Sequence, residues 1–397
     1  MHPWRTLVQS VAVTLVNLRT LPARLGPSAV AVVGMVGVVG VLVAVLSMAE
    51  GFRATMANTG AADTVIVMRA GSDSEMTSIL MREDIDIVSD AEEIARTPSG
   101  PLASAELFVI VDLIKASTGT VANAPLRGVE PVAFGVRQVR IVEGRMFVPG
   151  RNEVVVGRAA RGEYRGLTVG STLRVGQSDW AVVGAFDAGG TVPDSELWCD
   201  ANVLGPLYQR GSSRQAVYAK LRSPDAFTAL KDRLTTDPRA KLMVMREREY
   251  YESQSRFVYS LITGLGTIIA LLMGIGAVFA AVNTMYSAVA SRTREIATLR
   301  ALGFGGLPVM LSVLAESMLL ALAGGAIGAA AAYLFFNGYQ AATMNWQSMS
   351  TIGFAFRVTP RLLANGLAYA LVLGLVGGLL PAIRAARLPV VVALREL

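Results

Sequence analysis

Few residues of this chain have the chemistry of a catalytic or metal-binding site. The 397 residues include one cysteine, Cys199, and one histidine, His2. A zinc site needs several thiolate or imidazole ligands, and a serine nucleophile needs a histidine as its base. An ATPase needs the loop GxxxxGK[ST], and no Gly-Lys pair occurs in the sequence. We therefore expect a chain that is not catalytic alone and binds no metal or cofactor; paired carboxylates remain the one route to hydrolysis.

The lone cysteine has no partner within the chain for a disulfide. We expect Cys199 to lie in the core of a soluble domain. A bridge to a second chain is the alternative.

One cluster of charges stands between two very apolar stretches, in the segment SRTREIATLRALGF at 291–304. Its charged residues are Arg292, Arg294, Glu295 and Arg300. A helix about four turns long would place Ile296 and Leu299 on one side and the charges on the rest. Arg292 and Glu295 would pair, and Gly303 would cap the helix end. We predict such a helix; a solvated loop that only orients the chain is the alternative.

The composition predicts a membrane protein. Hydrophobic residues make up 53% and charged residues 17% of the chain, against about 25% charged residues in soluble domains. Four stretches reach the roughly 20 apolar residues that a bilayer requires. They are 25–50, which includes the start of a stalk; 247–290, which begins with a stalk; 305–336; and 362–383. The first is too long for a cleaved signal peptide, so we predict four transmembrane helices.

The arginines predict the orientation. They precede the first span (Arg5, Arg19), lie in 291–304, and follow the fourth span (Arg384, Arg387). Because cytoplasmic loops are rich in arginine and lysine, both termini should be cytoplasmic. The net charge of +6 does not suggest nucleic-acid binding, since these arginines border apolar spans rather than forming one basic stripe.

The segments outside the spans follow from this orientation. Residues 1–24 have the spacing of an amphipathic helix in the cytoplasmic interface, or of a poorly anchored first turn of the span. Residues 51–246 should form an extracytoplasmic domain, 337–361 an outer loop, and 384–397 a cytoplasmic tail. No proline or glycine occurs between Glu247 and Gly264, so the second stalk and span should be one helix.

The outer segment has the pattern of an α+β domain inserted between the first and second spans. Runs rich in β-branched residues at 63–69, 105–114 and 152–157 predict strands. A strand, a helix and a strand follow towards the end of the segment, in 216–246. We expect two small lobes.

Glycines recur at helical spacing in the spans. They are Gly34, Gly37, Gly40, Gly324, Gly328, Gly374 and Gly378. Such residues let helices approach closely in lipid. They could serve packing within one chain or a seam between two copies.

Glu316 is the single charge of the third span. A carboxylate there is costly unless it is paired or near the interface. We expect a structural role near the cytoplasmic face, hydrogen-bonded to a neighbour; substrate contact is the alternative.

The chain resembles a known family at several points. The run SRTREIATLRALGFGGLPVMLSVLAESMLLALAGGAIGA and the final LPAIRAARLPVVVALREL are similar to the signatures of FtsX/MacB-type ABC transporter permeases. This similarity covers the four spans and the tail, about half of the chain. It is weaker over the outer domain, where NEVVVGRAARGEYRGLTVGSTLRVG resembles a MacB-like periplasmic core domain.

The resemblance implies partners and a coupling site. In the family, the helix after the second span is a coupling helix that seats on an ATP-binding subunit. The matching positions here are Arg292, Arg294, Glu295, Ile296, Leu299 and Arg300. ATP and Mg would belong to a dimeric ATPase, expected on a separate chain because no ATPase domain precedes the first span in this sequence. A second copy of this chain, a periplasmic adaptor, an outer-membrane exit duct and membrane lipid would be the other partners, in a bacterial inner membrane.

Three functions fit this resemblance. The leading expectation is an efflux permease in which the ATPase moves the outer domains by mechanotransmission. The alternatives are extraction of lipoproteins or lipids, and FtsX-like regulation of a cell-wall hydrolase. A membrane enzyme would be a fourth possibility, with no site to assign to it. The neighbouring reading frames would discriminate among them.

Overall fold

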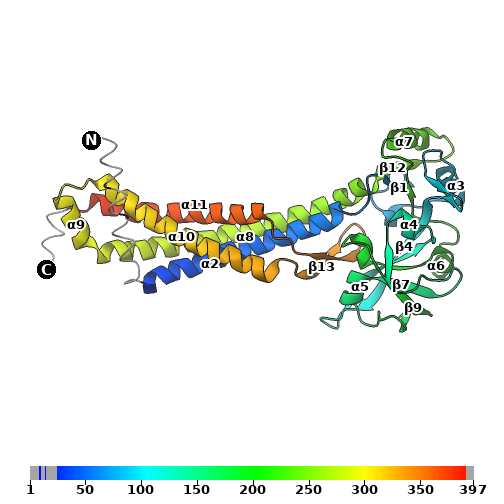
Figure 1. Cartoon of the computed structure of the whole chain (residues 1–397), viewed down its shortest axis with the longest axis horizontal. Coiled ribbons are helices and arrows are strands. Elements are labelled where there is room, and N and C mark those ends of the chain that lie inside the picture. Colours follow the sequence, from blue (N-terminus) through cyan, green and yellow to red (C-terminus); the bar gives the residue numbers. More distant parts are fainter. Residues whose placement is uncertain (1–8, 10–13, 15–24, 390–397) are drawn as a thin grey trace. The chain divides into compact units, whose positions relative to one another are not determined.

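The computed structural model describes Gln9, Thr14 and residues 25–389 (Figure 1). The interfacial helix expected at 1–24 and the last residues of the expected tail lie outside this part of the chain. The chain divides into two compact units. One comprises residues 1–50, 260–339 and 356–397, and the other comprises residues 51–259 and 340–355.

The first unit is built from long apolar helices. They are α2 (Leu25–Ala57), α8 (Glu247–Ser291), α10 (Gly306–Phe336) and α11 (Pro360–Arg387), with the short α9 (Thr293–Ala301) after α8. Each of the four long helices is long and apolar enough to cross a membrane, which confirms the prediction of four apolar helices. The helix α8 is continuous over 45 residues, or about 68 Å, as expected from the absence of breakers at its start.

Most of the singled-out glycines pack the helices of one chain together. A Cβ added at Gly328 of α10 would lie 2.6 Å from the Val36 carbonyl oxygen of α2. A Cβ at Gly378 of α11 would lie 2.6 Å from the Ser317 Cβ of α10. The same close approach holds at Gly324 and Gly374. A Cβ added at Gly40 would lie 3.7 Å from the Gly328 carbonyl oxygen. At Gly324, Gly328, Gly374 and Gly378 the facing helix is too close for any larger side chain, whereas at Gly40 the contact is an ordinary one.

Two glycines of α2 differ from the others. An added Cβ at Gly34 or Gly37 would meet no atom within 4 Å. Val33, directly before Gly34 and one helical turn before Gly37, is 68% exposed. This stripe of α2 is therefore not used for packing within the described part of the chain.

The second unit is built on a ten-stranded sheet. Its strands are β1 (Thr64–Arg69), β4 (Ala103–Ile114), β5 (Val121–Val129), β6 (Arg140–Gly144), β7 (Glu153–Gly157), β8 (Thr172–Val175), β9 (Ser178–Asp187), β10 (Leu197–Asp200), β11 (Ala216–Lys220) and β12 (Leu242–Arg246). Their order is β12-β1-β11-β4-β5-β10-β7-β9-β6, with β8 paired to β9. The pairs β5–β10 and β7–β9 are parallel, and the other pairs are antiparallel.

Short helices cover this sheet. They are η2 (Glu75–Thr77), α3 (Arg82–Ser89), α4 (Ala133–Val136), α5 (Arg158–Glu163), η3 (Val192–Ser195), α6 (Ala201–Leu207) and α7 (Ala226–Thr236), and a small ladder joins β2 (Arg96–Thr97) to β3 (Gly100–Pro101). The sequence patterns at 63–69, 105–114, 152–157 and 216–246 correspond to strands and to the β11–α7–β12 unit.

The long strand β4 joins the two halves of the sheet. Its first residues pair with β11, with Ala105 opposite Val217, and its later residues pair with β5, with Val109 opposite Leu126. One hydrophobic cluster gathers on the half with β1, β11 and β12, and another on the half with β5, β7 and β10. Cys199 of β10 is fully buried in the second cluster, as predicted for a core side chain.

The stretch expected to be the outer loop, 337–361, contains a hairpin. Its strands are β13 (Gln340–Asn345) and β14 (Ser350–Ala355), which belong to the sheet-containing unit. The Gly353 amide donates to Ser195 Oγ at 2.9 Å, and Asn345 Nδ2 donates to Gln254 Oε1 at 2.8 Å. The hairpin is therefore fastened to this unit by hydrogen bonds.

Candidate coupling site

The charged segment forms a helix shorter than predicted. The helix α8 continues to Ser291, and α9 covers only Thr293–Ala301 instead of the whole of 291–304. Gly303 has a φ of 95° and ends the helix. The Gly303 amide donates to the Arg300 carbonyl and the Phe304 amide to the Leu299 carbonyl, which is the Schellman arrangement. The expected glycine cap is present.

Arg292 lies at the junction of α8 and α9, and its side chain is buried. Its Nη2 donates to Glu316 Oε1 at 2.6 Å, and its Nε donates to the Ala288 carbonyl at 3.3 Å. The expected pair of Arg292 with Glu295 is wrong, because an exposed pair three residues apart contributes only a few tenths of a kcal/mol. A carboxylate within an apolar helix gains much more from a partner. Arg292 is the hydrogen-bonded neighbour expected for Glu316.

The apolar side of α9 packs inside the chain. Ile296 and Ala297 are buried, and Ile296 shares a hydrophobic cluster with Val309 of α10 and Ala385 of α11. Leu299 and Arg300 are half-buried, and Arg300 Nη1 donates to the Leu388 carbonyl. Ile296 is therefore not exposed as an apolar anchor for a partner, contrary to the sequence-based picture of this helix.

The opposite side of α9 is exposed and defines the candidate site. Arg294, Glu295, Thr298 and Ala301 are exposed, and Leu302, just past the helix, is 73% exposed. We call these five residues the α9 face. Thr298 and Leu302 were absent from the predicted set. Residues 294, 298 and 302 are four apart and therefore lie on one side of a helix. The sequence alone does not show that this side is the exposed one; that becomes clear only because the Arg292 side chain is buried.

The neighbouring helices hold the α9 face in place. Arg292 connects it to α10 through Glu316, and the Arg300 bond reaches the chain just after α11. The Arg384 guanidinium of α11 lies 5.3 Å from the centre of the Tyr286 ring of α8. The position of α9 is therefore fixed against α10 and the end of α11, and Arg384 joins α11 to α8.

A second group of charges lies buried in the sheet-containing unit. Its members are Glu75, Glu106, Arg127, Arg137, Glu196 and Glu247, which we call the charge cluster. Arg127 binds Glu75 at 2.6 Å and Glu196 at 2.8 Å. Arg137 binds Glu247 at 3.2 Å. This cluster could not be predicted from the sequence, because its members come from six separate segments between 75 and 247.

The charge cluster contains more carboxylates than arginines. Burial raises the pKa of Glu106 to about 7, against the opposing effect of Arg137 and Arg127. Its Oε1 atom is buried and has no hydrogen-bond partner among the residues that the structure describes. No group of three or more His, Cys, Asp or Glu side chains in the described residues could hold a metal ion. Within this cluster the raised pKa favours the protonated form of Glu106 below about pH 7.

The charge cluster also fastens the start of α8 to the sheet. Glu247 is the first residue of α8 and pairs with Arg137. The Tyr250 hydroxyl accepts a hydrogen bond from the Glu75 amide at 3.1 Å, and the Tyr251 hydroxyl accepts one from Arg137 Nη2 at 2.9 Å. The beginning of α8 is thus bound by charge-assisted and neutral hydrogen bonds.

Two family models match the chain. Residues 28–237 match the MacB-like periplasmic core domain, and residues 267–390 match the FtsX-like permease C-terminal region.

Among curated relatives, the macrolide export ATP-binding/permease protein MacB of Azoarcus sp. (strain BH72) is 26% identical over 410 residues, which cover 97% of this chain and 59% of the relative. The MacB protein of Pasteurella multocida (strain Pm70) is 27% identical over 306 residues, which cover 72% of this chain and 45% of the relative. The chain thus spans about half the length of the curated relatives it matches.

Two solved structures align with part of this chain. The periplasmic region of MacB from Actinobacillus actinomycetemcomitans aligns at 15% identity with a TM-score of 0.37, over 49% of this chain and 93% of that one. The extracellular domain of the noncanonic ABC-type transporter YknZ from Gram-positive bacteria aligns at 17% identity with a TM-score of 0.36, over 46% of this chain and 99% of that one.

Proposed function

This chain belongs to the MacB-like and FtsX-like family of ABC transporter permeases, and we propose that it is a membrane subunit driven by a separate dimeric ABC ATPase. In this proposal ATP and Mg are bound by that partner, through its own GxxxxGK[ST] loop. The chain itself would bind no cofactor and perform no hydrolysis.

The observation that carries the proposal is the α9 face. It combines a cation, an anion and an exposed leucine on one short helix that follows an apolar span. Protein interfaces commonly combine an apolar contact with a charged rim that sets the register. We propose Arg294, Glu295, Thr298 and Leu302 as the contacts with the ATPase. Arg292, Ile296, Leu299 and Arg300 would support this surface from behind.

Force would pass from the α9 face to the outer domain through α8. This helix has no proline, and it is continuous from Glu247 to Ser291. Its start is fastened to the sheet through Arg137 and the two tyrosines that follow Glu247. A continuous helix fixed at its start suits mechanotransmission better than a flexible linker would.

The orientation and partners follow from the arginine distribution and the family. We propose a bacterial inner-membrane protein with both termini and 291–304 in the cytoplasm. The sheet-containing domain at 51–246, inserted between the first and second spans, would be periplasmic. A second copy would contact the stripe of α2 at Gly34 and Gly37, since small residues favour helix association in lipid.

Efflux is the function that the names of the relatives favour. Two of them are described as macrolide export proteins, at 26% and 27% identity. We propose efflux with a periplasmic adaptor and an outer-membrane exit duct. Extraction of lipoproteins or lipids is the second candidate, favoured by an apolar pocket between α8 and α11. Regulation of a cell-wall hydrolase remains an alternative within the family.

The proposal is tested with a double variant of the α9 face. Glu295→Ala with Leu302→Ala removes one charge and one apolar contact, in a full chain co-expressed with a candidate ABC ATPase. Interface anchors cost 1 kcal/mol or more when truncated, so affinity for the ATPase should fall about tenfold or more. The matched control, Asp179→Ala with Val121→Ala, removes the same kinds of side chain from the surface of the other unit and should leave affinity unchanged. Wild-type association of the double variant, or ATP hydrolysis by the chain alone, would refute the proposal.

A further inference from the structure

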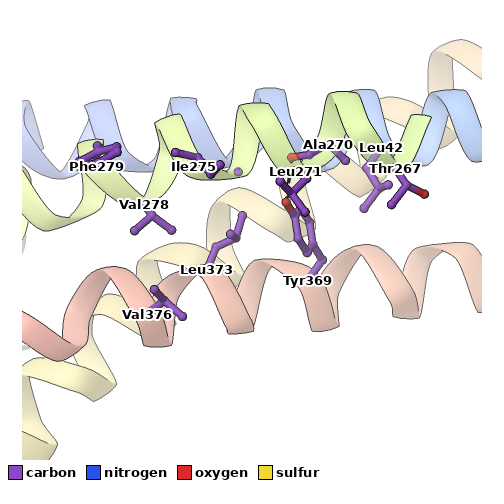
Figure 2. A pocket seen from close by; sticks show the side chains of 11 residues that line it. Leu42, Thr267, Ala270, Leu271, Ile275, Val278, Phe279, Tyr369, Leu373 and Val376 are labelled. Carbon is purple, nitrogen blue, oxygen red and sulfur yellow. Dashed lines mark hydrogen bonds between the residues drawn. The ribbon is translucent and has the colours of Figure 1, made fainter. Parts of the chain in front are cut away.

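A pocket of about 540 Å³ lies within the helical unit (Figure 2). Its sides come from α8 and α11, and Leu42 of α2 contributes to the lining. In Figure 2, Tyr369 and Leu373 extend from α11 towards α8. The volume falls within the roughly 300–1,000 Å³ of small-molecule sites.

Specific contacts between α8 and α11 form one wall of the pocket. The Tyr369 hydroxyl donates to the Ala270 carbonyl of α8 at 2.8 Å. Gly274 makes room for this phenol, because an added Cβ would lie 2.1 Å from the Tyr369 oxygen. The tyrosine therefore spaces the two helices at a fixed distance.

The pocket is elongated along α8. Its lining on this helix begins at Thr267, continues through Leu271 and Ile275, and ends at Phe279. The twelve residue-to-residue steps from Thr267 to Phe279 rise about 18 Å. This length is slightly more than half of the roughly 30 Å hydrocarbon core, so it corresponds to about one leaflet.

The chemistry of the lining excludes most polar ligands. The Thr267 hydroxyl donates to the Thr263 carbonyl at 2.7 Å, and the Tyr369 hydroxyl is bonded to α8. All other side chains that line the pocket are hydrocarbon. Sites that orient a polar ligand present a few convergent polar groups, and here the two hydroxyl donors are already used within the chain.

The rim opens sideways from the helices. Leu271 is 57% exposed and Phe279 is 71% exposed, and Val376 on the facing helix is half exposed. These residues would lie beside lipid in a membrane-spanning chain. Large side chains at the rim also differ from the small residues through which helices associate in lipid, which are found instead on the α2 stripe.

We propose that this pocket binds one acyl chain of a bilayer phospholipid, which enters sideways between α8 and α11. The length of one leaflet, the hydrocarbon lining and the lateral rim all match such a chain. The lipid would fill the space that Tyr369 and Gly274 hold open, and it would do so whichever substrate the permease moves.

The test uses the full chain in nanodiscs of phosphatidylglycerol and phosphatidylethanolamine with a diazirine on one acyl chain. After illumination, mass spectrometry of peptides measures labelling at the deep lining residues Leu42 and Leu373. Ile275→Trp fills the pocket from its rim. Leu272→Trp is the matched control, since Leu272 is the 63% exposed neighbour on the same helix and does not line the pocket.

We expect labelling of the deep residues to fall at least fivefold in Ile275→Trp and to stay unchanged in Leu272→Trp. Val376→Trp fills the pocket from α11 and should give the same loss, which guards against misfolding of one variant. Equal deep labelling in all variants would overturn the proposal. An efficient disulfide between two copies of an Ile275→Cys variant would also overturn it, because a second copy would then cover the rim.

Discussion

Arg292 and Glu316 form a buried ion pair that joins the α8–α9 junction to the first third of α10. The Arg292 Nη2 atom lies 2.6 Å from Glu316 Oε1, and the two residues are 4% and 3% exposed. An arginine suits this position because its guanidinium stays charged and is less strongly hydrated than an ammonium. The pair ties the proposed ATPase contact to a transmembrane helix.

Removing one member of this pair should be far more damaging than removing both. Glu316→Ala leaves the Arg292 charge buried and should lower the free energy of unfolding by about 3–5 kcal/mol. Glu316→Gln keeps an acceptor and should cost less, and Arg292→Leu with Glu316→Leu should be close to neutral. Thermal unfolding of the full chain in detergent ranks the stabilities of these three variants. A Glu316→Ala variant as stable as Glu295→Ala, which changes an exposed carboxylate, would contradict the role of the pair.

The glycines that pack helices within the chain should not tolerate a methyl group. Gly328→Ala would force α10 away from the Val36 carbonyl and should cost about 1–3 kcal/mol, the usual range for overpacking. Gly276→Ala is the control, because an added Cβ there meets no atom within 4 Å. The melting temperatures of the two variants in detergent provide the comparison, and equal values would show that α2 and α10 are not this close.

Gly37 should behave differently from Gly328. Among residues 25–389 nothing lies within 4 Å of an added Cβ at this position, so Gly37→Ile should leave the fold of the chain intact. It should nevertheless weaken self-association, because a large side chain blocks close helix approach in lipid. Sedimentation of the detergent-solubilised chain gives its oligomeric state. If the Gly37→Ile variant dimerises as well as the wild type, α2 is not the contact between two copies.

The apolar helices and the family could be predicted from the sequence because both are local signals. Length and hydropathy reveal each span, and the charged segment at 291–304 carries its own motif. The direction of the Arg292 side chain could not be predicted, since its partner Glu316 is 24 residues away and competes with the nearer Glu295. Local spacing therefore indicated a helix at 291–304 and included the exposed Arg294 and Glu295, but it also counted Arg292 and Ile296, which are buried, among the contact residues.

Two other features depend on contacts between distant residues. The charge cluster requires six segments to meet in the fold, and none of them is unusual alone. The β13–β14 hairpin has only weak strand signals of its own, and hydrogen bonds to Ser195 and Gln254 help to define it. The sequence analysis accordingly expected a loop there.

The proposed topology predicts opposite signals from two reporter fusions. A fusion at residue 150, in an exposed turn before β7, should report a position outside the cytoplasm. A fusion at residue 300, in α9, should report a cytoplasmic position, because arginine-rich connections stay inside. Alkaline phosphatase and fluorescent-protein fusions read the two sides. A cytoplasmic signal at 150 would reject the four-span orientation.

The charge cluster predicts a pH dependence of stability. Burial raises the pKa of Glu106 from the ordinary value of 4.5 to about 7. Between these two values the folded chain keeps a proton that the unfolded chain has released, so the free energy of unfolding should fall as the pH rises from about 4.5 to about 7. The two pKa values set an upper limit of about 3 kcal/mol on this loss. Glu196 affects stability in a different pH range. Burial opposes its ionisation, but Arg127 and Arg137 outweigh this effect and lower its pKa. Its stabilising contribution is therefore lost only as the pH falls below about 4.5.

A Glu106→Gln variant isolates this effect, because glutamine resembles the protonated carboxyl and does not titrate. The decrease between pH 4.5 and 7 should be smaller in Glu106→Gln than in the wild type, and the variant should be the more stable of the two above pH 7. Urea unfolding of the full chain in detergent, followed by the fluorescence of the buried Trp180 and Trp198, measures the free energy at each pH. Glu83→Gln, which changes an exposed carboxylate in α3, should keep the wild-type slope. Parallel pH profiles for Glu106→Gln and the wild type would mean that Glu106 is ionised in the folded chain, with water or a rearranged arginine satisfying its second oxygen.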